Sequence, residues 1–596
     1  MLMNILQKFQ HRFQGLSKAF IRFPLTGISF FISTIITILM ISSNSDDYSK
    51  LVMTLIVSGF LFLISDITYE RFFDKTTTRI FLYGISVVLA VLYYFTLREN
   101  FNSSVEVFIR TGIIMFALFI AFILIPSIKS DVTFNESFII TFKAFFISFF
   151  YSLILYLGMS IIILTIDNLL FDISSKLFAY LASIIFMFFA PMYLLSIIPV
   201  YIRKIDELSE VKGEKLKEIF RLSMIDKYLE ILISYIIIPL TSIFTVILLL
   251  YIIKNIGGSF FTNSLLEPMI VSYSITVIIV YLLSSTLSNR FAFLYRLIFP
   301  KILIPIVLLQ IISSIMSIGD MGITHGRYFV ILYGLFSIIT GVIFSVLPVR
   351  KNGYVAALLI LFSIISILPP VDAFHVSINS QVRVLEETLT KNDMLKNNEI
   401  VRKDTLEQED KKKIANATRY LYERDALNKV KFLPTIEGYP DINKVYGFDE
   451  YEYNDEYQYV NIVLKSNSSI NVTEYDVFLD TYLNLFDKNE NSSFISEFNH
   501  NGASYKVSKV SDGIKSDLVL LDPNNLELIR MSEDEIINHF ENYSSEYNEL
   551  TSDEATITKE NDKVKLSIVV KNLFYSSTEN EKQFKEMNCY IIIELK

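Results

Sequence analysis

Four side chains of the types that bind divalent metals stand in two short segments of the chain. Asp320 and His325 follow one apolar stretch, and Asp372 and His375 follow another. Carboxylate and imidazole groups are suitable ligands for divalent ions. The hypothesis that follows is a metal site formed by these four residues, provided that the two segments meet at one face of the protein.

A second pair of carboxylates, Asp46 and Asp47, lies in a short polar segment between two apolar stretches. Polytopic glycosyltransferases that use lipid-linked sugars keep a catalytic or metal-binding carboxylate in the first outer loop. The two aspartates are therefore candidate catalytic residues by position. A solvated loop is the alternative interpretation, because the segment is short and carries no companion motif.

The sequence lacks the common signatures of several enzyme classes. It contains no Gly-rich phosphate loop, no H-E-x-x-H, no nucleophile elbow and no kinase motif set. Cys589 is the single cysteine, which excludes an intramolecular disulfide and zinc sites built from several cysteines. No cofactor is evident from the sequence.

The elements that must position the candidate residues are apolar helices. The chain has 596 residues, of which 52% are hydrophobic, and a helix needs about 20 apolar residues to cross a bilayer. The sequence predicts eleven such spans, the last of them the shortest. They are 24–41, 51–67, 80–96, 111–128, 144–166, 177–201, 228–253, 269–287, 302–318, 328–347 and 354–368.

Lysine and arginine residues alternate between the loops in the pattern of a membrane protein. They gather in the amino-terminal arm and in every second loop, and cytoplasmic loops carry the basic excess. These basic segments are 1–23, 71–79, 203–227, 290–301 and 350–351. We therefore expect a cytoplasmic amino terminus, and eleven crossings put the C-terminal domain outside the cytoplasm. Ten crossings would put it inside.

Charge divides the chain at Pro369 and Pro370. Residues 1–370 hold 27 of the 53 Lys and Arg and 20 of the 62 Asp and Glu, a net charge of +7, whereas the remainder has a net charge of −16. The acidic region argues against nucleic acid as a partner, since a phosphate-binding face is basic. Abundant Ile, Asn, Lys, Phe and Tyr without Trp favour a bacterial protein, so the lipid bilayer of a plasma membrane is the expected partner.

The predicted fold class is a polytopic α-helical membrane protein with a C-terminal soluble α+β domain. A basic arm (1–23) precedes a transmembrane bundle (24–370), a juxtamembrane helical linker (371–430) and the soluble domain (431–596). Ser532 and Glu535 form a capping box for a helix through Tyr543. Periodicity predicts helices at 376–390 and 404–430 and strands at 457–464, 505–510, 518–521, 564–570 and 590–595.

Polar groups are scarce inside the predicted spans. We expect Lys143 to reach the membrane surface by snorkelling and Asp66, close to Arg71, to lie at a solvated helix end. Gln310 lies in the middle of the ninth span, where an interhelical hydrogen bond is expected. The scarcity of ionisable groups weighs against a proton-coupled pump.

The segment 322–328, with the sequence GITHGRY, opens the tenth predicted span. Further residues of the same pattern are Tyr235, Pro239, Phe299, Pro300, Pro369, Pro370, Asp372, Val376, Ser377 and Gln381. Over 177–389 the chain resembles the bacterial membrane proteins grouped as domain of unknown function 4153, although Trp is absent and Pro369 stands where that family has Gly. The resemblance implies a polytopic fold with an appended domain and supplies no catalytic residues. It makes Arg327 and Tyr328 candidate binding or coupling residues, with an interfacial anchor pair as the alternative.

Three functions are compatible with these features. The leading interpretation is a non-catalytic membrane protein whose outer domain senses or binds an envelope ligand or partner protein while the bundle anchors it or transmits the signal. The alternatives are a transporter or lipid-flipping protein, and a glycosyl or lipid-group transferase that uses Asp46 or Asp47. For the first, we predict that the loop before the tenth span contacts the start of the linker, with Arg327 near Asp372, Ser377 or Gln381.

Overall fold

A computed structural model describes most of the chain, which divides into two compact units. The bundle unit comprises Met1–Glu399 and Asn416–Tyr439, and the sheet unit comprises Ile400–Ala415 and Pro440–Lys596. The described residues are 15–97, 105–206, 211–255, 266–403, 405–433, 438–448, 458–483, 492–511, 516–540, 547–577 and 582–596.

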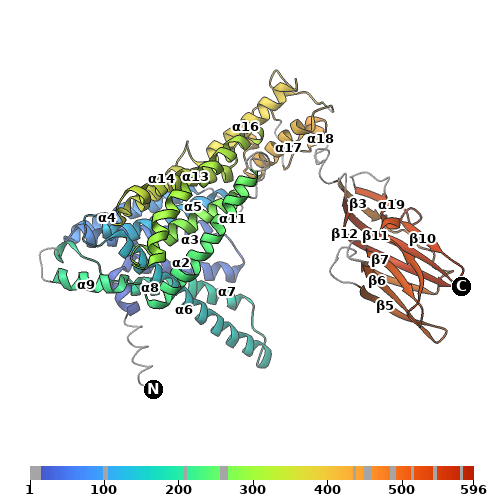
Figure 1. The fold of residues 1–596 in the computed structure, drawn as a ribbon, viewed down its shortest axis with the longest axis horizontal. Helices are drawn as coiled ribbons and strands as arrows, with labels where there is room; N and C mark the ends of the chain where they lie inside the picture. Colours follow the sequence, from blue (N-terminus) through green and yellow to red (C-terminus); the bar gives the residue numbers. More distant parts are fainter. Residues whose placement is uncertain are drawn as a thin grey trace. The chain divides into compact units, whose positions relative to one another are not determined.

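Apolar helices make up the bundle unit (Figure 1). Within the described residues, eleven helical segments are long and apolar enough to cross a membrane, which confirms the predicted fold class and makes the chain a multi-pass membrane protein. The elements are α2 (Pro24–Ser43), α3 (Ser49–Phe72), α4 (Thr76–Thr96), α5 (Val105–Leu124), η2 (Ile125–Ser127), α6 (Phe134–Leu169), α7 (Lys176–Ala182), η3 (Ser183–Phe189), α8 (Ala190–Ile197), η4 (Lys204–Asp206), α9 (Val211–Ser223), α10 (Lys227–Ile231), η5 (Leu232–Ile237), α11 (Ile238–Asn255), α12 (Leu266–Ser284), α13 (Arg290–Met321), α14 (His325–Val346), η6 (Val349–Lys351), α15 (Gly353–Ile367), α16 (Ala373–Lys391) and η7 (Leu427–Lys429).

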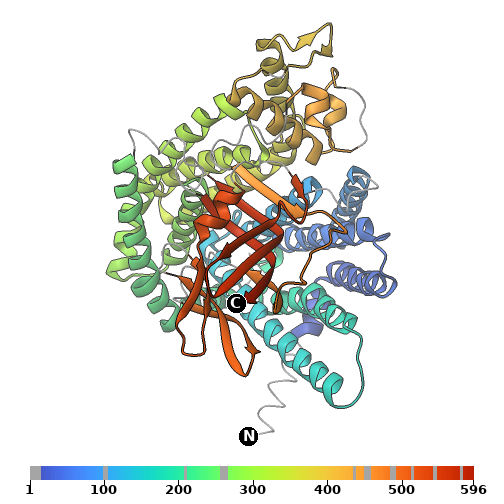
Figure 2. The same cartoon turned by 90° about the vertical axis from the view of Figure 1, so that its right-hand side faces the viewer.

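Two spans accommodate a proline through a change of helical pitch. The segments η3 and η5 are π-helical turns that end shortly before Pro191 and Pro239. Proline lacks an N–H group, and its ring displaces the carbonyl group four residues earlier. Because a π-helical turn locally rearranges the backbone bonding, each span continues past its proline. The helix α6 lies beside α7 and α8 in both views (Figures 1 and 2).

Small residues bring α13 and α14 into close contact. A Cβ atom added at Gly341 would lie 3.0 Å from the carbonyl oxygen of Pro300, and one added at Gly334 would lie 2.9 Å from Ile311. Glycine at such positions allows helices in a membrane to approach closely. The loop that joins these two closely packed helices contains part of the candidate site.

The sheet unit has one apolar core shared by two sheets. Val507 and Leu518 of the four-stranded sheet, Ile568 and Ile591 of the larger sheet and Ile536 of α19 (Glu533–His539) all belong to it. The larger sheet has the order β4-β12-β11-β3-β9, with β10 paired to β11, and the smaller has the order β5-β6-β7-β8. The strands are β3 (Gln458–Leu464), β4 (Val477–Leu483), β5 (Ser492–His500), β6 (Ala503–Ser511), β7 (Ser516–Leu521), β8 (Glu527–Met531), β9 (Tyr547–Leu550), β10 (Thr556–Glu560), β11 (Val564–Ser577) and β12 (Lys582–Leu595).

The predicted elements of the last third have counterparts in the structure. The five predicted strands correspond to β3, β6, β7, β11 and β12, and the predicted helices to α16 and to α17 (Gln408–Glu423). The short elements β1 (Leu395–Lys396), β2 (Glu399–Ile400) and α18 (Ile442–Tyr446) complete the chain. The capping box is present, since the Ser532 N–H donates to Glu535 at 2.8 Å and the Glu535 N–H donates to Ser532 Oγ at 3.2 Å. The helix ends at His539, and Tyr543 lies outside the described residues.

Candidate functional site

The carboxylate of Asp372 stands at the start of α16 and is completely buried. Its Oδ1 atom accepts the backbone N–H groups of Phe374 at 3.1 Å and His375 at 3.2 Å, and its Oδ2 atom lies 2.6 Å from Nδ1 of His375. A side chain that accepts the first N–H groups of a helix satisfies donors that have no partner within the helix. Asp372 therefore both caps α16 and holds a negative charge inside the protein.

The cation beside this carboxylate is Arg110 of α5. Its guanidinium lies 2.6 Å from Oδ1 of Asp372, donates to the carbonyl oxygen of Ile367 at 2.8 Å and lies 2.8 Å from Glu106. It also lies 5.4 Å from the ring centroid of Phe374. One side chain thus joins α5, the end of α15 and the start of α16.

The loop between α13 and α14 packs against the middle of α16. Gly322 has a φ of 72° and a ψ of 179°, a conformation that is open essentially only to glycine. A Cβ atom there would lie 2.7 Å from Val384. Gln381 donates to the carbonyl oxygens of Met321 at 3.0 Å and Ile323 at 3.2 Å. The predicted contact between this loop and the start of the linker is therefore present, with Gln381 as its main polar contact.

The remaining residues of the GITHGRY segment have separate structural roles. Thr324 caps α14 by accepting the N–H of Arg327 at 3.3 Å, and the Tyr328 hydroxyl donates to the carbonyl oxygen of Val371 at 2.6 Å. The Arg327 guanidinium donates to the carbonyl oxygen of Gly322 at 3.4 Å, among other interactions. Asp372 pairs with Arg110, a residue that the sequence interpretation missed because it lies 262 positions away.

The hydroxyl group of Tyr420 connects the starts of α14 and α16 to α17. The Tyr420 hydroxyl accepts the backbone N–H of His325 at 3.0 Å, lies 3.0 Å from His325 Nδ1 and donates to Ser377 Oγ at 2.9 Å. His325 also stacks on Phe374 with ring centroids 5.6 Å apart. The starts of α14 and α16 and the second half of α17 therefore meet at Tyr420. We call the residues 110, 322–328, 371–381 and 420 the α16 site.

A comparison with known protein families identifies the family to which this part of the chain is similar. Residues 30–397 match the model of a family described as "Domain of unknown function (DUF4153)". The chain belongs to this family. The match begins within α2, includes α16 and ends before the strands of the sheet unit. Comparisons with curated proteins and with solved structures gave no match.

The α16 site of this DUF4153 protein contains three of the four predicted metal ligands, His325, Asp372 and His375. Asp372 and His375 are in contact, but His325 bonds to Tyr420 instead. Among the described residues, no group of three or more His, Cys, Asp or Glu is placed to hold a metal ion. The side chain of Asp320 lies outside the described part.

The other proposed carboxylates lie apart from any polar cluster that the structure describes. Asp46 and Asp47 are exposed in the segment between α2 and α3, where the Asp47 N–H donates to Ser45 Oγ at 3.2 Å. Their use by a transferase stays a prediction.

The prediction of a solvated helix end at Asp66 is wrong. Asp66 is 1% exposed, and its Oδ1 atom lies 2.6 Å from the Arg79 guanidinium and 2.6 Å from the Tyr83 hydroxyl. Arg71, the neighbour suggested by the sequence, donates instead to the carbonyl oxygen of Ile128 at 3.0 Å. The reason is the tight turn between α3 and α4, which folds the first turn of α4 back over Asp66.

Two further polar groups in the spans differ in their surroundings. Lys143 donates to the carbonyl oxygen of Met224 at 2.8 Å, with its side chain 21% exposed, as snorkelling requires. Gln310 is buried, and its Nε2 atom has no hydrogen-bond partner among the described residues. The interhelical bond expected there is not made by that nitrogen.

Proposed function

We propose that this protein is a non-catalytic signalling or scaffolding protein of the bacterial plasma membrane. In this proposal the sheet unit lies outside the cytoplasm and binds an envelope ligand or partner protein, and the α16 site passes the binding event to the spans. The single observation that carries the proposal is the position of Tyr420 on α17. Residues 408–415 of that helix belong to the sheet unit, and residues 416–423 belong to the bundle unit.

The physical argument rests on the directionality of hydrogen bonds. A rotation or shift of α17 moves the Tyr420 hydroxyl, which accepts from the first turn of α14 and donates to α16. Hydrogen bonds weaken steeply as their geometry departs from the optimum. A ligand that favours one position of α17 would therefore favour one arrangement of both helix starts, which is the differential interaction that a conformational signal requires.

Amide hydrogen exchange tests the transmission step. The Tyr420→Phe variant removes the acceptor of the His325 N–H, so faster exchange is expected at 322–328 and at the start of α16. Tyr422→Phe is the matched control, because Tyr422 lies two residues further along α17, is 42% exposed and packs on Tyr439. Removal of the strands, by ending the chain before residue 458, is expected to change exchange at 322–328 in the wild type but not in Tyr420→Phe. No change in the wild type would contradict the proposal.

Thiol labelling tests on which side of the membrane the sheet unit lies. Burial raises the pKa of the Cys589 thiol to about 12, so this cysteine is inert towards maleimides and an introduced one reports alone. Asn501→Cys, in the exposed turn between β5 and β6, is expected to react with a membrane-impermeant maleimide in intact cells. Lys217→Cys on α9 is expected to react only after lysis. The reverse pattern would place the sheet unit in the cytoplasm.

A further inference from the structure

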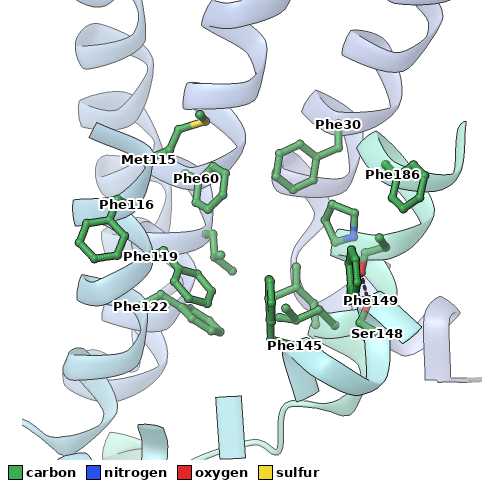
Figure 3. Close-up of a pocket in the computed structure, with 15 residues that line it drawn as sticks. Phe30, Phe60, Met115, Phe116, Phe119, Phe122, Phe145, Ser148, Phe149 and Phe186 are labelled. Atoms are coloured by element: carbon green, nitrogen blue, oxygen red, sulfur yellow. Dashed lines mark hydrogen bonds between the residues drawn. The ribbon is translucent and has the colours of Figure 1, made fainter. Parts of the chain in front are cut away.

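Two apolar cavities lie between the spans, and no residue of the α16 site lines either of them. The first has a volume of about 450 Å³ and is lined by α2, α3, α5, α6 and the η3–α8 segment. Figure 3 shows phenylalanine rings of these helices pointing into it from both sides. The rings include Phe30, Phe116, Phe119, Phe122, Phe145 and Phe149.

The second cavity is larger and runs along the spans. It has a volume of about 780 Å³ and is lined by α5, α6, α12, α14 and α15. On α15 the lining extends from Val355 to Ser366, which is about 16 Å at 1.5 Å per residue. Phe116 and Phe119 line both cavities, so two rings of α5 form the wall between them.

The linings contain only a few hydroxyl groups, those of Ser148, Tyr333, Ser363 and Ser366, and two of them donate to the backbone. Ser148 donates to the carbonyl oxygen of Ala190 at 2.7 Å, and Ser366 donates to the carbonyl oxygen of Ser363 at 2.7 Å. A polar solute would lose its hydration in these cavities and find few hydrogen-bond partners in return, which is costly. The linings therefore select against sugars, ions and peptides and favour hydrocarbon.

Both cavities are open towards the faces that the bilayer covers. Phe116 and Phe149 of the first are each 48% exposed, and Ile275 of the second is 42% exposed. The hydrocarbon of the surrounding lipid is therefore the nearest occupant, and an empty space of this size would lose the dispersion contacts of its lining.

We propose that the two cavities bind acyl chains of bilayer phospholipids, with Phe116 and Phe119 as the partition between neighbouring chains. The lipid enters sideways from the bilayer and occupies space between α12 and the α5–α15 pair. This site is independent of the signalling role proposed above, since neither the sheet unit nor Tyr420 takes part in it.

Tryptophan fluorescence gives a direct test, because the chain has no Trp. Phe336 and Phe344 lie two turns apart on α14 and are 2% and 4% exposed, but only Phe336 lines a described cavity. The single-Trp variants Phe336→Trp and Phe344→Trp would be reconstituted in phosphatidylcholine vesicles with or without bromine on the acyl chains. We expect brominated chains to quench Phe336→Trp as strongly as Phe95→Trp, which is 75% exposed on α4, and to leave Phe344→Trp bright.

A blocking variant separates binding in the cavity from general lipid contact. A Cβ atom at Gly112, which lines the second cavity, or at Gly84 of α4 would meet no atom within 4 Å. In the Phe336→Trp background, Gly112→Phe is expected to abolish most of the quenching, and Gly84→Phe is expected to leave it unchanged. Native mass spectrometry of the wild type and of Gly112→Phe supplies a second readout, with retained phospholipid mass expected only in the wild type. Equal quenching at positions 336 and 344 would overturn the proposal. It would also be overturned if Phe336→Trp stayed unquenched because a second copy of the chain covers the cavity in a dimer.

Discussion

The two ends of the bundle unit each bury a carboxylate beside an arginine, but they do so with different parts of the chain. Asp66 and Arg79 are 13 positions apart on consecutive helices, whereas Arg110 and Asp372 are 262 positions apart. The first pair fixes a helical hairpin. The second joins α5 to the helix that follows the last span, so it determines where the appended part of the chain attaches. Similar ion pairs thus hold a local hairpin at one end and join distant parts of the chain at the other.

The two carboxylates also differ in the hydrogen-bond donors that they keep when the arginine is removed. Asp66 keeps only the Tyr83 hydroxyl, and its Oδ2 atom has no partner among the described residues. Asp372 keeps two backbone N–H groups and the His375 ring. The end with fewer remaining donors is expected to be more sensitive to loss of its arginine.

The largest effect is expected for Arg79→Met. This change leaves a buried carboxylate with one neutral donor, and breaking a buried pair in this way costs about 3–5 kcal/mol. Denaturation of the detergent-solubilised protein by increasing SDS fractions measures the loss. If Arg79→Met is no less stable than Arg110→Met, the number of remaining donors does not decide how sensitive each carboxylate is to the loss of its arginine.

Arg110→Met is expected to have a smaller effect on stability, about 1.5–3 kcal/mol, the usual contribution of hydrogen bonds to a charged group. Its effect should be concentrated at one place. Amide exchange is expected to increase at the first turn of α16 and at the end of α15, where Arg110 bonds to Ile367, and to stay unchanged at the turn between α3 and α4. An increase spread evenly over the bundle would instead indicate general destabilisation.

These two pairs also mark the limit of what the sequence could predict. The spans follow from the length of apolar runs, and the contact of the 322–328 loop with Gln381 follows from short connections between α14 and α15. Arg110 could not be identified, because its partner lies across 262 positions and no local pattern links them. Asp66 was placed wrongly because its place near the end of an apolar run, close to Arg71, suggested a solvated helix end, whereas the tight turn brings Arg79 to it. The cavities depend on side-chain packing between many helices, which periodicity does not encode.

Gly322→Ala tests whether the α16 end is as tightly packed as the contacts indicate. A side chain in this conformation costs about 1–3 kcal/mol, and the added Cβ would also displace Val384. Gly319→Ala is the matched control, because Gly319 lies on α13 with no atom within 4 Å of an added Cβ. We expect thermal unfolding in detergent at a lower temperature for Gly322→Ala only. Equal unfolding temperatures would show that the loop can move away from α16.

The smallest effect is expected in the sheet unit, where charged pairs are exposed. The Arg530 guanidinium lies 2.6 Å from Glu527 and 2.8 Å from Asp517, and the Arg530 side chain is 39% exposed. Exposed pairs contribute between about 0 and 1 kcal/mol because solvent screens them. Arg530→Gln should therefore cost far less than either arginine change in the bundle unit.

The contribution of the Arg530 ion pairs to the free energy of unfolding depends on pH with a definite sign. The hydrogen bond from Arg530 holds the pKa of Glu527 below its ordinary value of 4.5. A carboxyl with a lowered pKa in the folded state stabilises the protein above its unfolded pKa and loses that contribution as the pH falls through the folded value. The fragment 458–596 carries the test, because all buried members of its apolar core lie between Ile462 and Ile593. Urea unfolding should separate wild type from Arg530→Gln at pH 7, and the separation should shrink as the pH falls below 4.5. A separation that stays the same in acid would mean that Arg530 acts through packing of its aliphatic stem and not through charge.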